Sequence, residues 1–170
     1  MKTSPPSFGN PRRSAQKRIP LELKDWLQNP PEGCVLETKE PNPMHEWVIL
    51  MQGPQAPSGM PKIYEGEVYR LSVRFTDEYP LEAPEVMFLP ESPIHPHIYS
   101  NGHICLDILY DTGNGGWSPA LTISKVCLSL RSMLASNSEK ERPHGDLDYC
   151  RRVATNSPKL TRWAFDDDTV

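Results

Sequence analysis

The amino-acid sequence predicts a single α+β domain with an N-terminal helix, an antiparallel sheet, a long loop and a central helix, in that order. Three observations support this class. A helical spacing of apolar residues comes before Asn29, three short strand-like runs follow it, and the helical spacing returns after Trp117. A chain of 170 residues is long enough to bury one core, so no second core is expected.

The first helix is predicted over residues 13–28, before an Asn-Pro-Pro sequence that ends the pattern. Pro20 conflicts with a helix of this length, because only the first turn of a helix tolerates proline, and the regular helix is therefore expected to begin there. Residues 1–12 are rich in Pro, Ser, Gly and Asn and are predicted to form a flexible tail. The predicted apolar face of the helix consists of Ile19, Leu23, Trp26 and Leu27.

Strands are predicted at residues 47–51, 68–75 and 86–89. In the second of these runs, apolar and polar side chains alternate, which indicates a strand with one buried face. The connections between the runs are short and rich in turn residues, which favours an antiparallel meander over parallel crossovers.

The central helix is predicted to begin behind Thr122 as its N-cap and to run for about three turns. Before it, residues 90–116 form a loop of about 27 residues with little periodicity. Loops of that length in a compact domain are usually functional or disordered, and the apolar residues in this one favour an ordered, functional loop. Those expected anchors are Ile94, Ile98, Tyr99, Ile104, Leu106, Ile108 and Leu109.

Charge and cysteine usage restrict the class of protein. A formal net charge of -4 gives no general attraction to nucleic acid or to anionic lipid, and neither is expected as a partner. The N-terminus has no apolar signal region, and no stretch reaches membrane-spanning length. The four cysteines are scattered without a C-x-x-C motif, so we expect free thiols in a cytoplasmic or nuclear protein.

Residues 95–109, HPHIYSNGHICLDIL, concentrate the chemistry of the loop. Three hypotheses remain open from the residues alone. Cys105 is a buried small hydrophobe, as most such cysteines are, or it is a thiol nucleophile served by neighbouring hydrogen-bond donors. In the third hypothesis it is a zinc ligand together with three histidines, although their spacing matches no common zinc finger: His95, His97 and His103.

The segment 95–109, followed by WSPALTISKV at 117–126, closely resembles the active-site region of ubiquitin-conjugating enzymes. The resemblance extends upstream through residues 17–31, 63–75 and 79–88, and so covers nearly all of the chain from about Lys17. It implies the fold of that family, with a four-stranded antiparallel meander. It also implies that the activating enzyme delivers ubiquitin to Cys105 as a thioester and that an amine then takes ubiquitin from it. By the same resemblance, no metal and no cofactor are expected for this chain, because ATP is used only by the upstream activating enzyme.

The resemblance implies roles for further residues around Cys105. His97 stands where the family carries an asparagine credited with supporting the oxyanion, and an imidazole can donate the same hydrogen bond. His95 and Asn101 are expected to brace the loop. Three acids are candidates to orient the incoming amine: Asp107, Asp146 and Asp148.

Two partner surfaces are implied in the same way. The positions that contact RING or U-box ligases in the family correspond to Leu81, Ser118, Pro119 and Ala120. A basic cluster on the first helix corresponds to the surface that meets the activating enzyme: Arg12, Arg13, Lys17 and Arg18.

The chain departs from the general family pattern towards its W-type members, which modify the α-amino group at protein N-termini. It carries His-Pro-His before Cys105, and residues 151–170 form a divergent, mobile C-terminal segment after a catalytic core at 13–150. Small insertions at 58–62 and 112–116 lengthen loops. Expected acceptor-site residues in the C-terminal segment are Trp163, Asp166 and Asp167.

Three functional alternatives stay open on the sequence alone. The first alternative is a lysine-directed conjugating enzyme, and the second is an inactive scaffold that binds ubiquitin or a ligase. The third is an enzyme for a different ubiquitin-like modifier. Retention of Cys105 within the full motif argues against the inactive scaffold.

Overall fold

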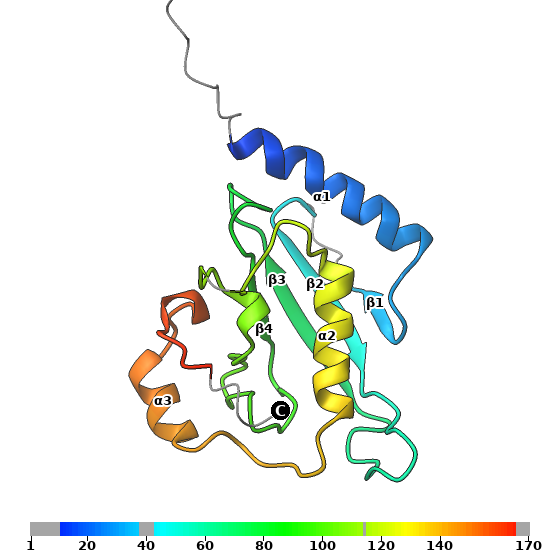
Figure 1. Cartoon of the computed structure of the whole chain (residues 1–170), viewed down its shortest axis with the longest axis vertical. Coiled ribbons are helices and arrows are strands. Elements are labelled where there is room, and N and C mark those ends of the chain that lie inside the picture. Colours follow the sequence, from blue (N-terminus) through cyan, green and yellow to red (C-terminus); the bar gives the residue numbers. More distant parts are fainter. Residues whose placement is uncertain (1–10, 38–42, 114, 166–170) are drawn as a thin grey trace, which may run out of the picture.

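The computed structural model of the protein describes residues 11–37, 43–113 and 115–165. In these residues the order of elements is a helix, a sheet, a long loop, a second helix and a third short helix (Figure 1). The strands are β1 (Cys34–Leu36), β2 (Glu46–Gln52), β3 (Val68–Arg74) and β4 (Glu85–Phe88). The helices are α1 (Pro11–Gln28), α2 (Ile123–Ala135) and α3 (Asp146–Val153), with 3₁₀ turns η1 (Asp107–Leu109) and η2 (Pro158–Leu160).

The sheet is an antiparallel meander in the order β1-β2-β3-β4, which confirms the predicted fold class. Ile49 of β2 pairs with Leu71 of β3, and Leu71 pairs in turn with Phe88 of β4, so these three fully buried side chains lie in one row across the sheet. The three predicted strands are present. β1 was not located by sequence, because three residues are too short to show an alternating pattern.

Helix α2 covers one face of the sheet (Figure 1), and its predicted start is confirmed. The Thr122 side chain accepts a hydrogen bond from the Lys125 N–H, at 3.3 Å, and so caps the first turn. The buried face of the helix supplies the centre of the core: Ile123, Val126, Cys127, Leu130 and Leu134.

Helix α1 corrects the expectation about Pro20. The helix runs through Pro20 without interruption, although a proline cannot donate the internal hydrogen bond. Burial of Ile19 and Trp26, which are 1% and 2% exposed, holds the helix against the core on either side of the proline and offsets the missing bond. Leu27 was predicted on the apolar face but is 71% exposed, and Glu22 is buried there instead.

The C-terminal part of the chain contains helix α3, which the sequence did not predict. Its buried side chain, Tyr149, contacts His103 of the long loop. The predicted flexible tail lies outside the described residues, except that α1 begins two residues inside it, at Pro11. Among the described residues no helix is long and apolar enough to cross a membrane.

Candidate active site

The long loop is folded against the core by a few buried apolar side chains. Ile98 and Ile104 are fully buried and pair with each other through an isolated bridge, and Leu109 in η1 is 1% exposed. Ile94 was expected to be an anchor but is 42% exposed. The remaining expected anchors are buried to a lesser degree: Tyr99, Leu106 and Ile108. The loop is therefore ordered by the burial of these side chains and not by the repeating hydrogen bonds of a helix or strand.

Cys105 lies on this loop with a half-buried side chain. Its backbone N–H donates to the His97 carbonyl at 2.8 Å, which fixes the residue against the histidine turn. Just after it, the Asp107 carboxylate accepts from the Ile108 N–H at 2.7 Å and holds the first turn of η1. The Cys105 Sγ lies 3.9 Å from the Ala164 carbonyl oxygen, so the C-terminal segment passes beside the thiol.

The other cysteines lie in different surroundings. Cys34 and Cys127 are buried in the core at 4% and 0% exposure, and the hydrogen bond to Cys34 together with burial raises the pKa of the Cys127 thiol. Cys150 is half-buried on α3, where its thiol contacts the Asp146 carboxylate at 3.6 Å. Cys105 is thus the half-exposed thiol within the ordered loop.

His95 is a buried brace between the loop and helix α2. Its Nδ1 accepts from the His97 N–H at 2.9 Å, and its Nε2 lies 3.3 Å from the Met133 carbonyl, to which it donates in the matching tautomer. Burial, with the nearby His97, lowers the pKa of His95 to about 4. Because the ring stays neutral and both nitrogens are occupied, its position fits the structural role expected of it.

His97 is half-buried, and its ring centroid lies 5.6 Å from that of His95. Its backbone is held on two sides, because the N–H binds His95 and the carbonyl binds Cys105. The structure therefore brings His97 beside Cys105, and the use of its ring as an oxyanion donor stays a prediction.

His103 and Asn101 shape the turn before Cys105. The Asn101 side-chain oxygen accepts from the His103 N–H at 3.1 Å. The His103 Nδ1 lies 2.7 Å from the Tyr149 hydroxyl of α3, and burial lowers the pKa of this histidine. Among the described residues no three His, Cys, Asp or Glu side chains gather as a metal site. The zinc hypothesis therefore has no support in the geometry.

An aromatic wall stands next to Cys105, made of Tyr99, Tyr110, Tyr149, Trp163 and Phe165. Its rings are in contact, with centroids 4.0 Å apart for Tyr99 and Tyr149 and 5.3 Å apart for Tyr110 and Trp163. The sequence indicated Trp163 but missed Tyr149, whose spacing carries no signal. A cavity of about 370 Å³ is bounded by three residues of this wall, Tyr110, Trp163 and Phe165, together with Asp111 and Lys159.

The predicted C-terminal segment has defined contacts as far as residue 165. The Tyr149 hydroxyl lies 2.9 Å from that of Thr161, and Lys159 pairs with Glu82 at 2.6 Å. Its expected mobility stays a prediction. Asp166 and Asp167 lie outside the described residues.

The other acids proposed to orient an amine have contacts of their own. Asp146 accepts from the Ser100 N–H at 2.7 Å and so ties α3 to the loop. Asp148 is 86% exposed at its side chain and pairs with Arg151 on the same helix. Neither of these contacts involves Cys105.

The expected ligase-binding residues lie together on the surface. Leu81 is 60% exposed, and Ser118, Pro119 and Ala120 are exposed on the neighbouring loop. The two loops are joined by the Trp117 indole, whose Nε1–H donates to the Pro80 carbonyl at 2.8 Å. An apolar side chain and a Ser-Pro-Ala turn thus form one exposed patch.

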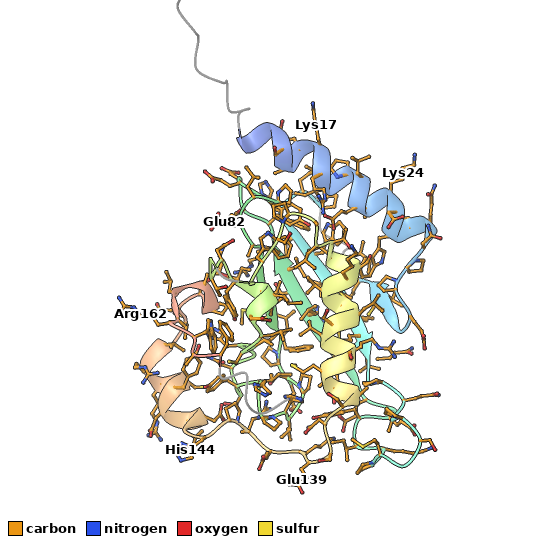
Figure 2. All side chains as sticks on the ribbon, in the orientation of Figure 1. Lys17, Lys24, Glu82, Glu139, His144 and Arg162 are labelled. Carbon is orange, nitrogen blue, oxygen red and sulfur yellow. The ribbon has the colours of Figure 1, made fainter. Side chains whose placement is uncertain are left out.

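The basic cluster on α1 is divided by the structure. Lys17 is exposed and points away from the sheet, as does Lys24 (Figure 2). Arg18 instead donates to Glu22 at 2.6 Å and to the Leu121 carbonyl at 2.8 Å, which ties α1 to the start of α2. Arg12 and Arg13 belong to α1, but their side chains lie outside the described part of the structure.

The two ends of the predicted insertion at 112–116 meet at one backbone carbonyl, that of Tyr110. The Tyr110 carbonyl accepts from both the Thr112 and Trp117 N–H groups, at 3.0 and 2.9 Å, so the chain returns to the same point after the insertion. The insertion at 58–62 lies on the connection between β2 and β3, which begins at Gly53.

Comparison with known proteins gives one consistent result. The family model described as ubiquitin-conjugating enzyme matches residues 18–161. A probable ubiquitin-conjugating enzyme E2 W of Dictyostelium discoideum is 51% identical over 91% of this chain and 96% of its own length. A ubiquitin-conjugating enzyme E2 W of Caenorhabditis elegans is 43% identical over 92% and 98%. Among solved structures, the ubiquitin-conjugating enzyme E2 UbcA1 of Agrocybe aegerita is similar with a TM-score of 0.69, at 34% identity over 91% of this chain and all of that one.

Proposed function

The chain belongs to the ubiquitin-conjugating enzyme family, and on that premise we propose that Cys105 is the residue that accepts ubiquitin as a thioester from the activating enzyme. Members of this family are transferases that work with ubiquitin, an activating enzyme and ligases. The observation that carries the assignment to Cys105 is the position of its thiol. It is half-exposed on the ordered loop, within the 95–109 motif, whereas Cys34 and Cys127 are buried in the core. Cys150 is also half-buried, but it lies on α3, outside the motif.

The proposed reaction has two steps. In the first, the Cys105 thiolate attacks the carbonyl carbon of the ubiquitin thioester on the activating enzyme, a new C–S bond forms, the old C–S bond breaks, and the sulfur of that enzyme leaves as a thiolate. In the second, a neutral amine attacks the carbonyl carbon, a C–N bond forms, the C–S bond breaks, and the sulfur leaves with the electron pair while the amine proton passes to solvent. Neither step uses a metal or cofactor of this chain. A free thiol of this kind suits the cytoplasm or nucleus, where thiols stay reduced.

A charging assay tests the thioester. We expect wild-type protein mixed with activating enzyme, ATP and ubiquitin to form an adduct that a thiol reductant removes. Cys105→Ser should give an adduct that resists the reductant, and Cys105→Ala should give none. Cys150→Ala is the matched control, because this thiol is also half-buried, and it should charge like wild type. A reducible adduct on Cys105→Ala would show that another residue carries ubiquitin.

We further propose that the amine acceptor is the α-amino group of a flexible protein N-terminus. Only a neutral amine is nucleophilic, and at pH ~7.4 roughly 20 to 30% of α-amines are neutral, against ~0.1% of lysine side chains. Two of the acids considered for amine activation, Asp107 and Asp146, are hydrogen-bonded to backbone N–H groups. A site without strong amine-activating groups favours the acceptor that is already neutral. The similarity to the W-type relatives supports the same substrate class.

Two peptides separate this proposal from a lysine-directed activity. One has a free N-terminus and no lysine, and the other has an acetylated N-terminus and one residue of the same sequence replaced by lysine. We expect the charged protein to transfer ubiquitin to the first at least ~10-fold faster, given the difference in neutral amine. Faster transfer to the acetylated, lysine-bearing peptide would favour the lysine-directed alternative while leaving the thioester chemistry intact.

The exposed patch formed by Leu81 and Ser118–Pro119–Ala120 is proposed to bind a ligase of the RING or U-box type. It combines one large exposed apolar side chain with a turn held by its own hydrogen bond, from the Ala120 N–H to the Ser118 hydroxyl at 3.3 Å. The proposal rests on the match between these four positions and those that contact such ligases in the family.

A further inference from the structure

The turn that carries the His-Pro-His motif must be placed accurately for the proposed chemistry. The turn consists of residues 92–98, and within it the His97 carbonyl accepts a hydrogen bond from the Cys105 N–H at 2.8 Å. A second hydrogen bond, from the Ile98 N–H to the His95 carbonyl at 3.0 Å, closes the turn on itself. A movement of this turn would therefore change the distance between the His97 ring and the Cys105 sulfur.

One side chain outside the loop holds both ends of this turn. The Arg142 Nη1 donates to the Pro93 carbonyl at 2.6 Å and to the Ile98 carbonyl at 3.1 Å, and its Nη2 reaches the Ser92 carbonyl at 3.2 Å. Ser92 and Ile98 are 6% and 0% exposed, so water has little access to replace these bonds. The guanidinium thus bridges the start of the turn, at Ser92 and Pro93, and its end, at Ile98.

Arg142 reaches the turn from a distant part of the chain. It lies on the connection between α2 and α3, which runs along the lower edge of the molecule and is marked in Figure 2 by the labelled side chains of Glu139 and His144. Tyr64 supports the same turn from another side, since its hydroxyl donates to the Ile94 carbonyl at 2.6 Å. Tyr64 thus contacts one point of the turn, whereas Arg142 contacts both its start and its end.

The chemistry of the contact requires arginine. A guanidinium offers five N–H groups in a planar fork and can serve several carbonyl oxygens at fixed angles, whereas the ammonium of lysine is a compact group on a flexible stem. Hydrogen bonds from a charged donor are also stronger than neutral ones. Lysine at this position would keep the charge but could not hold Pro93, Ile98 and Ser92 in the same geometry.

We propose that Arg142 is a positioning residue for ubiquitin transfer: by fixing the turn 92–98 it sets the His97 ring at the distance from Cys105 that attack on the thioester requires. This inference rests on the proposed function of Cys105 and on the proposed donor role of His97. It assigns the α2–α3 connection a part in the transfer step, through the contacts of Arg142 with the backbone carbonyls of the turn.

The test is a double-mutant cycle on protein already charged with ubiquitin. Arg142→Ala and Arg142→Lys are made in the wild-type and in the His97→Ala background, with Arg151→Ala as the matched control, because this arginine is 79% exposed on α3. Discharge to the lysine-free peptide is measured in single turnovers over a range of peptide concentrations.

We expect Arg142→Ala to lower the maximal discharge rate by about 10- to 100-fold, because a displacement of about 1 Å at a reacting group costs that much. The peptide concentration at half-maximal rate should not change. Arg142→Lys should recover part of the rate, and Arg151→Ala should match wild type. In the His97→Ala background, Arg142→Ala should slow discharge by less than about 2-fold, since coupled residues are not additive.

Two results would overturn the assignment. One is a wild-type discharge rate in Arg142→Ala, and the other is an equal slowing in both backgrounds, which would indicate a general structural role. If Arg142→Ala does not fold, as judged by thermal unfolding, the cycle is run with Arg142→Lys, whose smaller loss must likewise vanish in His97→Ala. Absence of any thioester in the wild type would instead contradict the proposed function itself.

Discussion

The sheet with α2 is one region and the long loop around Cys105 is another, and the two regions are stabilised in different ways. In the first region, the strands and α2 bury apolar side chains in one core, among them Ile49, Leu71 and Leu130. In the loop, single polar side chains, among them His95 and Arg142, hold backbone groups one at a time. A core substitution should therefore reduce stability and leave transfer chemistry intact, whereas substitution of His97 in the loop should do the reverse, and His95, which joins the loop to α2, should affect stability.

The largest effect is expected in the core. Leu130→Ala removes a fully buried side chain at the centre of α2 and should lower the free energy of unfolding by about 2–5 kcal/mol. Leu128→Ala, on the same helix but 48% exposed, should change it by about 0.5 kcal/mol or less. Urea unfolding measures both. Equal losses for the two leucines would show that burial on α2 does not determine the stability of this region.

His95 connects the two regions, and its effect should depend on pH. Its pKa is lowered from 6.5 to about 4 in the folded protein, so the folded state binds fewer protons than the unfolded chain between these values. The contribution of His95 to the free energy of unfolding should therefore be fully present above pH 6.5. It should fall by on the order of 3 kcal/mol as the pH drops from 6.5 to about 4.

The measurement compares wild type with His95→Gln by urea unfolding between pH 4 and pH 7. Glutamine cannot titrate in this range but can still donate to the Met133 carbonyl, so the advantage of wild type should shrink as the pH falls. His103, whose pKa is also lowered, is present in both proteins and cancels from the difference. A difference that stays constant with pH would contradict the assigned cause.

The smallest effect on stability, with a clear effect on chemistry, is expected at His97. If its ring donates to the oxyanion, His97→Ala should still be charged with ubiquitin but should discharge to a peptide amine about 100-fold more slowly. His97→Asn, which restores the family's usual donor, should recover most of that rate. A discharge rate equal to that of wild type in His97→Ala would exclude a catalytic role for this side chain.

The same contrast explains which features were predicted from sequence. The helical and alternating patterns gave the fold class, three strands and α2 with its Thr122 cap. The patterns failed where a single tertiary contact decides the outcome. Pro20 sits inside α1, because burial on either side of it holds the helix together. Helix α3 was missed because Tyr149, its buried side chain, packs against a loop.

For the site, the sequence by itself determined the motif around Cys105 and, through it, the family. It did so because residue identity and spacing within 95–109 are local properties of the chain. Only the tertiary structure decided that Arg142, Tyr149 and the segment ending in Phe165 lie beside that motif. Each of these contacts joins residues far apart in sequence through only a few hydrogen bonds or ring contacts. Such contacts produce no periodicity or spacing in the sequence from which they could be predicted.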